Sequence, residues 1–415
     1  MFRANFLGAV KIAILERLQH MKYFRFFIVA AIFLMPLSAS AATKFEVSGW
    51  IPYWRAATGT ADALPNLDKL TEVNPFVYTL KSDGTLLDNG KLGEEPWASF
   101  IVAAKAKKVR VIPTIMTSNS GLLHTLFSNQ KSRIALEDRI TALVKQNGFD
   151  GIDIDFEGKR AEDKEYFSTF LKGLYMRMGT KWVMCTIESR TPIDSRYYGT
   201  DTPPDATLYA NDFKAINKYC DRVRIMAYDQ QDVDQQLVQQ AASSSQLYAP
   251  VADPAWVEKV VNLAAKDIKK SKILIGVPTY GYEYDVTAYA GNEYVYDILW
   301  TFNPGYATST AAAYGITPQR NAAGEMYFTY VTASTSSTPV SLGPNSAPLA
   351  ALAAVAYADT YNSHLNFRLM DWPDAQSIQT KIDLAKKLGV RGISIFKLDG
   401  GEDPNIWAVL QGVKK

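Results

Sequence analysis

Short apolar runs alternate with amphipathic stretches along most of the chain. The runs are rich in β-branched and aromatic residues, which is typical of strands. Eight such strands are expected at Val47–Tyr53, Phe76–Thr79, Val109–Ile115, Gly151–Phe156, Trp182–Ile187, Arg222–Ala227, Ile273–Pro278 and Gly392–Phe396. Helical periodicity lies between most of them, as at Ser132–Gln146, Ala161–Met178, Pro254–Lys269 and Ala375–Leu388.

The runs are apolar on both faces, as expected for parallel strands that are covered by helices. Eight β/α alternations favour an α/β fold of the closed (β/α)8 type, a TIM barrel, over an open doubly wound sheet. No Gly-x-Gly-x-x-Gly sequence follows a strand, which further weakens a dinucleotide-binding fold.

The alternation breaks once, between Tyr284 and Phe367. This stretch contains strand-like pieces at Glu293–Trp300 and Met326–Val331, and its aromatic residues favour a packed subdomain over a linker. We expect a small α+β insertion between strand 7 and strand 8, on the active face of the barrel. The expected organisation is a first part of the barrel at 42–283, the insertion at 284–367 and the last part of the barrel at 368–415.

The N-terminus has the pattern of a secretory signal peptide. Lys22 and Arg25 precede an apolar run of 12 residues, Phe26–Leu37, and small residues follow up to Ala42. The run is shorter than the roughly 20 residues of a membrane span, so an uncleaved anchor is the less favoured alternative. We expect residues 1–41 to be removed and the mature protein to be secreted or to lie in the periplasm or cell envelope. A signal peptide of this kind normally starts at a methionine placed as Met21 is. Residues 1–20 are therefore either a stretch assigned upstream of the true start codon or an extended basic region.

Composition narrows the functional classes. The chain has 47% hydrophobic and 21% charged residues, which excludes intrinsic disorder, and its net charge of +2 gives no reason to expect nucleic acid. Cys185 and Cys220 are expected at different depths, which favours two buried thiols over a disulfide. His124 and His364 are isolated, so no metal and no cofactor are expected.

The strongest chemical signal lies in the fourth strand, Asn147–Gly158. Side chains alternate between the two faces of a strand, so Asp153, Asp155 and Glu157 line up on one face. In a barrel this face is the interior, and the three carboxyl groups rise toward the mouth at the carboxyl end of the strand.

Three carboxyl groups in a confined interior cannot all ionise cheaply, so their pKa values must be pushed apart. A strand with a purely structural role has no reason to carry them. Metal binding is the other explanation, and the shortage of His near these strands weakens it. The pattern indicates acid catalysis, because a general acid that works near neutral pH needs a raised pKa.

The run Asp150-x-x-Asp153-x-Asp155-x-Glu157 resembles the D-x-x-D-x-D-x-E signature of family-18 glycoside hydrolases, the chitinase class. Gly49–Trp54 is similar to the first strand of that family, Met226–Asp229 to its sixth and Gly276–Gly281 to its seventh. The resemblance extends from about residue 45 to the C-terminus.

The resemblance implies substrate-assisted retaining catalysis, in which the enzyme supplies an acid but no nucleophile. Glu157 would protonate the glycosidic oxygen and later act as the base for water. Asp155 would hold the 2-acetamido group of the substrate, Asp153 would share a proton with Asp155, and Tyr228 would orient the acetamido carbonyl.

Further substrate contacts are expected from residues near the strand ends: Asp229, Met226, Tyr53, Trp54, Tyr280 and Phe396. Asp150 and Gly151 stand at the start of the fourth strand, and we expect structural roles for them. The implied substrate is a β-1,4-linked polymer that contains N-acetylglucosamine, either a chitin-type oligosaccharide or peptidoglycan. We expect a monomer.

Two segments depart from the chitinase pattern. Thr114–Gly121 replaces the usual S-x-G-G-like turn, and Phe396 stands where a Trp usually floors the sugar pocket. Phe can still stack on a sugar ring, but it offers less area and no N–H donor. Both changes resemble bacterial cell-wall and spore-cortex members more than chitinases that attack crystalline chitin.

Two other functions compete with this interpretation. A lectin on a catalytically inactive barrel would be expected to lose the acid at Glu157, yet Phe396 keeps that alternative open. A different retaining glycosidase could use Glu188, after the fifth strand, as its own nucleophile. We expect Glu188 instead to be a rim residue or an ion-pair partner of Arg190.

Overall fold

The structure is a computed structural model that describes residues 44–243, 246–332 and 347–413. The expected signal peptide, residues 1–41, lies outside the described residues. Within the described residues, no helix is long and apolar enough to cross a membrane.

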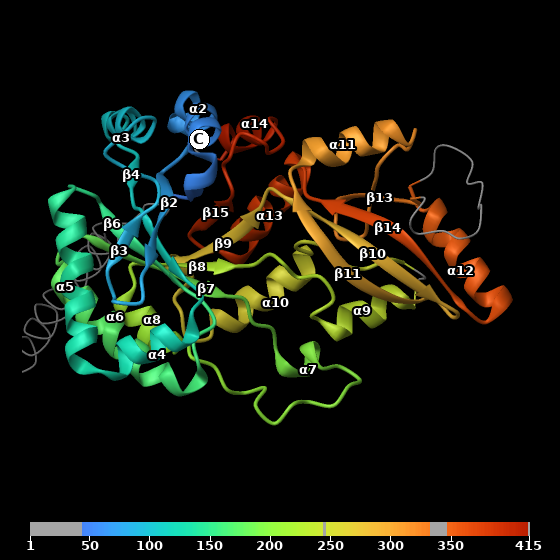
Figure 1. Ribbon diagram of the computed structural model, residues 1–415, viewed down its shortest axis with the longest axis horizontal. Coiled ribbons are helices and arrows are strands. Elements are labelled where there is room, and N and C mark those ends of the chain that lie inside the picture. Colours follow the sequence, from blue (N-terminus) through green and yellow to red (C-terminus); the bar gives the residue numbers. More distant parts are fainter. Residues whose placement is uncertain (1–43, 244–245, 333–346, 414–415) are drawn as a thin grey trace, which may run out of the picture. The chain divides into compact units, whose positions relative to one another are not determined.

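In the described part of the chain, eight parallel strands close into a barrel (Figure 1). Closure is direct, since β1 pairs with both the second and the last strand of the barrel. The strands are β1 (Glu46–Pro52), β2 (Glu72–Leu80), β5 (Thr114–Thr117), β6 (Gly151–Phe156), β7 (Trp182–Glu188), β8 (Arg222–Met226), β9 (Ile273–Pro278) and β15 (Gly392–Phe396). The predicted (β/α)8 barrel is confirmed.

Two short strands lie beside β2. β3 (Leu86–Asp88) pairs with it antiparallel, and β4 (Arg110–Val111) pairs with it parallel. β4 and β5 replace the single strand predicted at Val109–Ile115. The interruption contains Pro113, which has no N–H to donate to a neighbouring strand.

Helices cover the outside of the barrel (Figure 1). They are α2 (Ala56–Ala63), α3 (Trp97–Ala106), α4 (Ser120–Ser128), α5 (Gln130–Gln146), α6 (Lys164–Met178), α8 (Phe213–Tyr219), α10 (Pro254–Ala264), α13 (Ala375–Leu388) and α14 (Ile406–Gln411). Two further helices, α7 (Ile193–Arg196) and α9 (Gln235–Ala242), contact each other, and α9 lines a pocket together with Tyr289 and Tyr294. Single 3-10 turns occur at η1 (Tyr53–Arg55), η2 (Leu64–Lys69), η3 (Ala161–Asp163) and η4 (Lys270–Lys272).

Side-chain caps define several helix starts. The carboxylate of Asp374 accepts from the N–H of Ser377 at the start of α13, and the Ser377 hydroxyl lies within hydrogen-bond reach of the Asp374 N–H, which completes a capping box. α13 ends at Gly389, whose φ of +67° is the left-handed conformation that closes helices. At α10, Asp253 is the N-cap and Pro254 occupies the first turn, where a missing N–H does no harm.

A second sheet of five antiparallel strands follows β9. Its strands lie in the order β11 (Glu293–Phe302), β10 (Gly281–Tyr289), β14 (His364–Trp372), β13 (Met326–Tyr330) and β12 (Gln319–Arg320). α11 (Pro304–Ala313) packs on one face of this sheet with Phe328 and Trp372. α12 (Leu349–Tyr361) packs against β10 and β14 beside Val286 and Phe367. The sheet begins at Gly281 and ends at Trp372, beyond both ends of the 284–367 range expected for the insertion.

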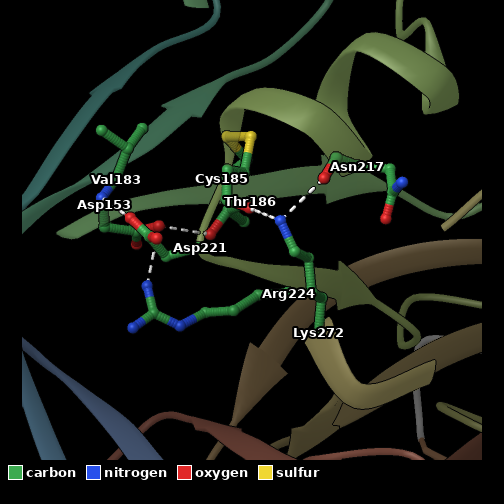
Figure 2. The surroundings of a disulfide bond; sticks show 9 residues. Asp153, Val183, Cys185, Thr186, Asn217, Asp221, Arg224 and Lys272 are labelled. Carbon is green, nitrogen blue, oxygen red and sulfur yellow. Dashed lines mark hydrogen bonds and ion pairs between the residues drawn. A yellow bond between two sulfur atoms is a disulfide. The ribbon is translucent and has the colours of Figure 1, made fainter. Parts of the chain in front are cut away.

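Cys185 and Cys220 form a disulfide, so the prediction of two free thiols was wrong (Figure 2). Cys185 points out of β7 toward the helix layer, and Cys220 caps α8 just before the chain enters β8. β7 and β8 are parallel neighbours, and the two Cα atoms are 5.9 Å apart, within the range that a disulfide spans. The prediction judged the depth of each cysteine from its position along its own segment. It did not include the register between β7 and β8, which sets how far apart the two residues lie.

Candidate active site

The acids of β6 rise through the barrel in the predicted order. Asp153 is 0% exposed, Asp155 is 4% exposed and Glu157 is half-buried at the carboxyl end of the strand. The alternate residues face the helix layer, where the ring of Phe156 lies 6.0 Å from Phe127 and 5.9 Å from Phe170. The local period of two therefore puts the carboxyl groups inside and the apolar anchors outside.

Asp153 is surrounded by donors and a cation. Trp50 Nε1 donates at 3.0 Å and the Thr114 hydroxyl at 2.8 Å to Oδ2, while the Thr186 hydroxyl donates at 2.9 Å to Oδ1. Arg224 Nη1 lies 2.7 Å from the same Oδ1 (Figure 2). Asp153 is therefore held in place by three hydrogen-bond donors and one cation.

Asp155 and Glu157 form the acid pair above that charge. Burial, followed by the charges of Glu157 and Asp153, raises the pKa of Asp155 well above its usual range. Burial and the charge of Glu188 also raise the pKa of Glu157, while Lys159 opposes this effect. Asp155 and Glu157 therefore both hold their protons to a higher pH than exposed carboxyl groups do.

Tyr228 stands opposite these acids, after β8. Its ring stacks on Phe396 with centroids 5.7 Å apart, and burial keeps the pKa of its hydroxyl well above the usual value. Gly276 in β9 leaves room for the Tyr228 ring because it has no side chain. A Cβ there would lie 2.8 Å from Cε1 of Tyr228 and 2.5 Å from the carbonyl oxygen of Ile225.

Asp229 is held at the mouth by two phenols from the start of the second sheet. Its φ is +58°, and its Oδ1 accepts from the hydroxyls of Tyr280 and Tyr282, the latter at 2.6 Å. Tyr280 follows β9 and Tyr282 belongs to β10. The barrel and the second sheet therefore meet at this carboxylate.

Glu188, at the end of β7, pairs with Lys159 and not with Arg190. Its carboxylate lies 3.4 Å from Lys159 Nζ, and it accepts from the N–H of Gly158 at 2.9 Å and from Asn211 Nδ2 at 2.7 Å. Arg190 instead donates to the carbonyl oxygens of Ala206 and Leu208. The expectation of an Arg190 partner was wrong, because the chain beyond β7 turns that side chain toward its own loop.

A cavity of about 370 Å³ opens at this end of the barrel. Aromatic, carboxylate and sulfur-bearing side chains make up most of its wall, which consists of Trp50, Trp54, Phe76, Met116, Asp155, Glu157, Glu188, Ser189, Met226, Tyr228, Asp229 and Phe396. An aromatic wall with a few convergent polar groups is typical of a site for a sugar ring.

Most of the residues expected at the site meet there. Trp54 lines the cavity and is 52% exposed, whereas Tyr53 is packed edge-on against Trp54 and does not line it. Tyr280 reaches the site through Asp229. Asp150 lies at the opposite end of β6, where its carboxylate accepts from the N–H of Val111.

Gly151 lies beside Asp150 with no room for a side chain, because a Cβ would collide with the carbonyl oxygen of Trp182. Both residues therefore contribute to the packing of β6 between its neighbouring strands.

Sequence reasoning did not identify several residues that support the acids: Thr114, Lys159, Thr186 and Arg224. Inward parity was a usable signal for Thr114 and Thr186 on β5 and β7, the two neighbours of β6, and for Arg224 on β8, one strand further. No such signal marks Lys159, since it follows the strand and folds back through a turn at Gly158.

The sequence profile of Glycosyl hydrolases family 18 matches residues 49–401. The chain therefore belongs to this family and is a family-18 glycosidase, as predicted.

Its relatives include spore-cortex enzymes. An uncharacterized glycosylase of Bacillus subtilis strain 168, YvbX, is 22% identical over 356 residues, which cover 84% of this chain and 88% of YvbX. The cortical fragment-lytic enzyme of the same organism is 26% identical over 355 residues, covering 82% and 67% of the two chains. The crystal structure of the spore cortex-lytic enzyme SleL of Bacillus megaterium QM B1551 has a TM-score of 0.65 at 21% identity, over 90% of this chain and 75% of that one. The expected similarity to cell-wall and spore-cortex members is confirmed.

Proposed function

We propose that the protein is an exported hydrolase of β-1,4 linkages in glycans that contain N-acetylglucosamine, and that it acts by substrate-assisted retaining catalysis. The observation that carries this proposal is the pair of Asp155 and Glu157, both with raised pKa values, at the base of an aromatic cavity. The raised pKa values keep a proton at this pair to a higher pH than at exposed carboxyl groups, as a general acid requires.

Glu157 is the general acid in this mechanism. It donates its proton to the glycosidic oxygen while the acetamido carbonyl oxygen of the substrate attacks the anomeric carbon and the glycosidic bond breaks. The product is an oxazolinium ion and a free sugar hydroxyl. The Glu157 carboxylate then accepts a proton from water as that water attacks the anomeric carbon, which opens the oxazolinium ring with overall retention.

Asp155 and Tyr228 position the acetamido group. The Oδ1 atom of Asp155 is buried without a hydrogen-bond partner among the described residues, which leaves it free to accept the acetamido N–H. The neutral Tyr228 hydroxyl donates to the acetamido carbonyl. Asp153, fixed by Arg224, tunes Asp155 from below, and the two share a proton.

The position of Glu188 argues against an enzyme nucleophile. Lys159, Asn211 and the N–H of Gly158 all bind its carboxylate, so a nucleophilic role would require these contacts to break. A glycosidase that relied on Glu188 would also cleave substrates without an acetamido group, and this provides a test.

Bacterial cell-wall glycan is the proposed natural substrate. The relatives named for cortex lysis support it, as does Phe396 in place of the usual Trp. Chitin oligosaccharides share the N-acetylglucosamine unit and serve as the comparison substrate.

The test compares the wild type with Glu157→Gln on fluorogenic N-acetylglucosamine oligomers, glucose oligomers and purified peptidoglycan strands. We expect cleavage of the N-acetylated substrates alone, with retention at the anomeric carbon, and a loss of roughly 10²–10⁴-fold or more in the variant. Cleavage of glucose oligomers would favour Glu188 as a nucleophile. Binding of N-acetylated oligomers without cleavage would establish the lectin alternative.

Export is a separate part of the proposal. The disulfide between Cys185 and Cys220 supports it, because disulfides persist in oxidising compartments. Mass spectrometry of the mature chain is expected to find Ala42 at its N-terminus. A mature protein that retained residues 22–41 would contradict cleavage.

A further inference from the structure

A buried lysine lies directly behind the acid pair. The side chain of Lys159 is 1% exposed, and its ammonium group donates to the carbonyl oxygen of Phe156 and lies 3.4–3.5 Å from both carboxylate oxygens of Glu188. The ammonium also lies 5.0 Å above the ring of Phe167. Lysine is rarely buried this completely without a specific partner.

The turn after β6 produces this arrangement. Gly158 adopts a φ of +62°, a conformation that side chains disfavour, and the chain reverses so that Lys159 points back along the strand. The N–H of Gly158 donates to Glu188 Oε1 at 2.9 Å. Gly158, which follows Glu157, therefore fixes Glu188 through its N–H, and Lys159 supplies the positive charge that pairs with Glu188.

The charges around Glu157 come from four places. Asp155 lies on the same strand, Glu188 on β7, Asp229 follows β8, and Lys159 is the cation among them. The remaining cavity wall is uncharged, with Tyr228 as its further titratable group. Three carboxyl groups thus surround the acid, and Lys159 compensates one of them.

We propose that the Lys159–Glu188 ion pair is a positioning unit for the general acid: it fixes the Glu188 side chain at one place in the wall beside Glu157 and so keeps the transferable proton on Glu157. This inference rests on the proposed role of Glu157. The two members act on Glu157 in opposite directions. The charge of Glu188 raises the pKa of Glu157, and the charge of Lys159 lowers it.

The experiment is a pH–rate profile of Lys159→Met, Glu188→Gln and the double variant on an N-acetylglucosamine oligomer. Activity falls as pH rises through the pKa of Glu157, since the acid must be protonated. This fall is the basic limb of the pH–rate profile. Lys159→Met is expected to move this limb up by about one pH unit and Glu188→Gln down by about one, because each variant removes a nearby charge that acts on Glu157. The double variant is expected to return close to the wild-type limb.

A matched control is Lys164→Met, the same substitution at an exposed position at the start of α6. It is expected to leave the limb in place. A merely structural role for the ion pair would lower the rate at every pH without moving the limb. Limbs that did not move, or that moved in the same direction in both single variants, would overturn the proposal.

A second measurement is independent of activity. Titration of the Glu157 carboxyl by ¹³C NMR, assigned by its loss in Glu157→Gln, should show the same opposite shifts. If the wild type cleaves no substrate, the proposed function fails, but this titration still decides the role of the ion pair. If Lys159→Met does not fold, the downward shift in Glu188→Gln decides it, because the Glu188 side chain is 32% exposed and glutamine keeps its size and its hydrogen-bonding oxygen.

Discussion

The guanidinium of Arg224 lies 2.7 Å from the carboxylate of Asp153 in the centre of the barrel, and both side chains are 0% exposed. Arg224 also pairs with the buried Glu72. The cation thus joins the lower part of the barrel to the first acid of the catalytic strand. The charge of Asp153 in turn helps to raise the pKa of Asp155.

Arg224→Met is expected to lower the free energy of unfolding by about 3–5 kcal/mol, because it leaves the buried Asp153 without its cation and leaves Glu72 paired with Arg110 alone. Urea denaturation measures the change. Arg160→Met is the matched control, since Arg160 is 47% exposed and its loss should change stability by about 0.5 kcal/mol or less. Equal effects in the two variants would contradict the role of Arg224.

Tyr228→Phe is expected to reduce kcat/KM by roughly 10²-fold, which is the effect of removing one well-placed donor from a developing charge. The ring remains and still stacks on Phe396, so the unfolding temperature should hardly change. Steady-state kinetics on an N-acetylated oligomer test this. Tyr166→Phe, on the exposed face of α6, should behave as the wild type does. Full activity of Tyr228→Phe would remove this hydroxyl from the mechanism.

Gly276→Ala is expected to impair both folding and catalysis. The added methyl group would press on Tyr228 and on the backbone of Ile225, and overpacking of this kind costs about 1–3 kcal/mol. In contrast, a Cβ on Gly305 in α11 meets nothing within 4 Å, so Gly305→Ala should be neutral or slightly stabilising. Thermal unfolding and kcat of both variants provide the comparison, and an active, stable Gly276→Ala protein would be the contrary result.

The double variant Cys185→Ala/Cys220→Ala is expected to lose about 3–4 kcal/mol of stability, since the bond closes a loop with a sequence separation of 35. Denaturant unfolding of the variant and the wild type measures the loss. Thiol titration of the denatured, unreduced wild type should find no free thiol from this pair. Two reactive thiols would show that the bond does not form.

Stability is also expected to depend on pH through Glu402. Burial, together with a hydrogen bond and the charge of Asp62, raises the pKa of Glu402 to about 8. The unfolded chain releases this proton near pH 4.5, so the contribution is complete below that pH and is lost as pH rises toward 8.

Glu402→Gln should therefore be more stable than the wild type at pH 8, by roughly 1–4 kcal/mol, and similar to it at pH 4. Unfolding temperatures across this range test the prediction. Glu165→Gln, at an exposed position on α6, should reproduce the wild-type curve. A Glu402→Gln curve parallel to that of the wild type would contradict the raised pKa.

The parts of the site that depend on local order could be predicted from the sequence. Strand alternation alone places Asp153, Asp155 and Glu157 on one face, and the structure has them there. The barrel could be predicted because eight apolar runs alternate with helical periodicity along the whole chain.

The remaining features depend on how neighbouring strands are aligned. The disulfide requires the register between β7 and β8, and the partners of Asp153 come from four strands that are distant in sequence. Burial of Lys159 depends on a turn whose direction is set by contacts with β7. No pattern within one segment contains this information.

Because Tyr280 and Tyr282 both donate hydrogen bonds to Asp229, the position of the junction matters when segments are exchanged between such proteins. A chimera that exchanged the second sheet for that of a relative would remove one of the two phenols if the junction were placed at Gly281. A junction placed after Tyr282 would transfer the outer strands and helices and would keep both native hydrogen bonds to Asp229. The boundary suited to exchanging modules therefore lies inside β10, after its second residue, and not at the start of the strand.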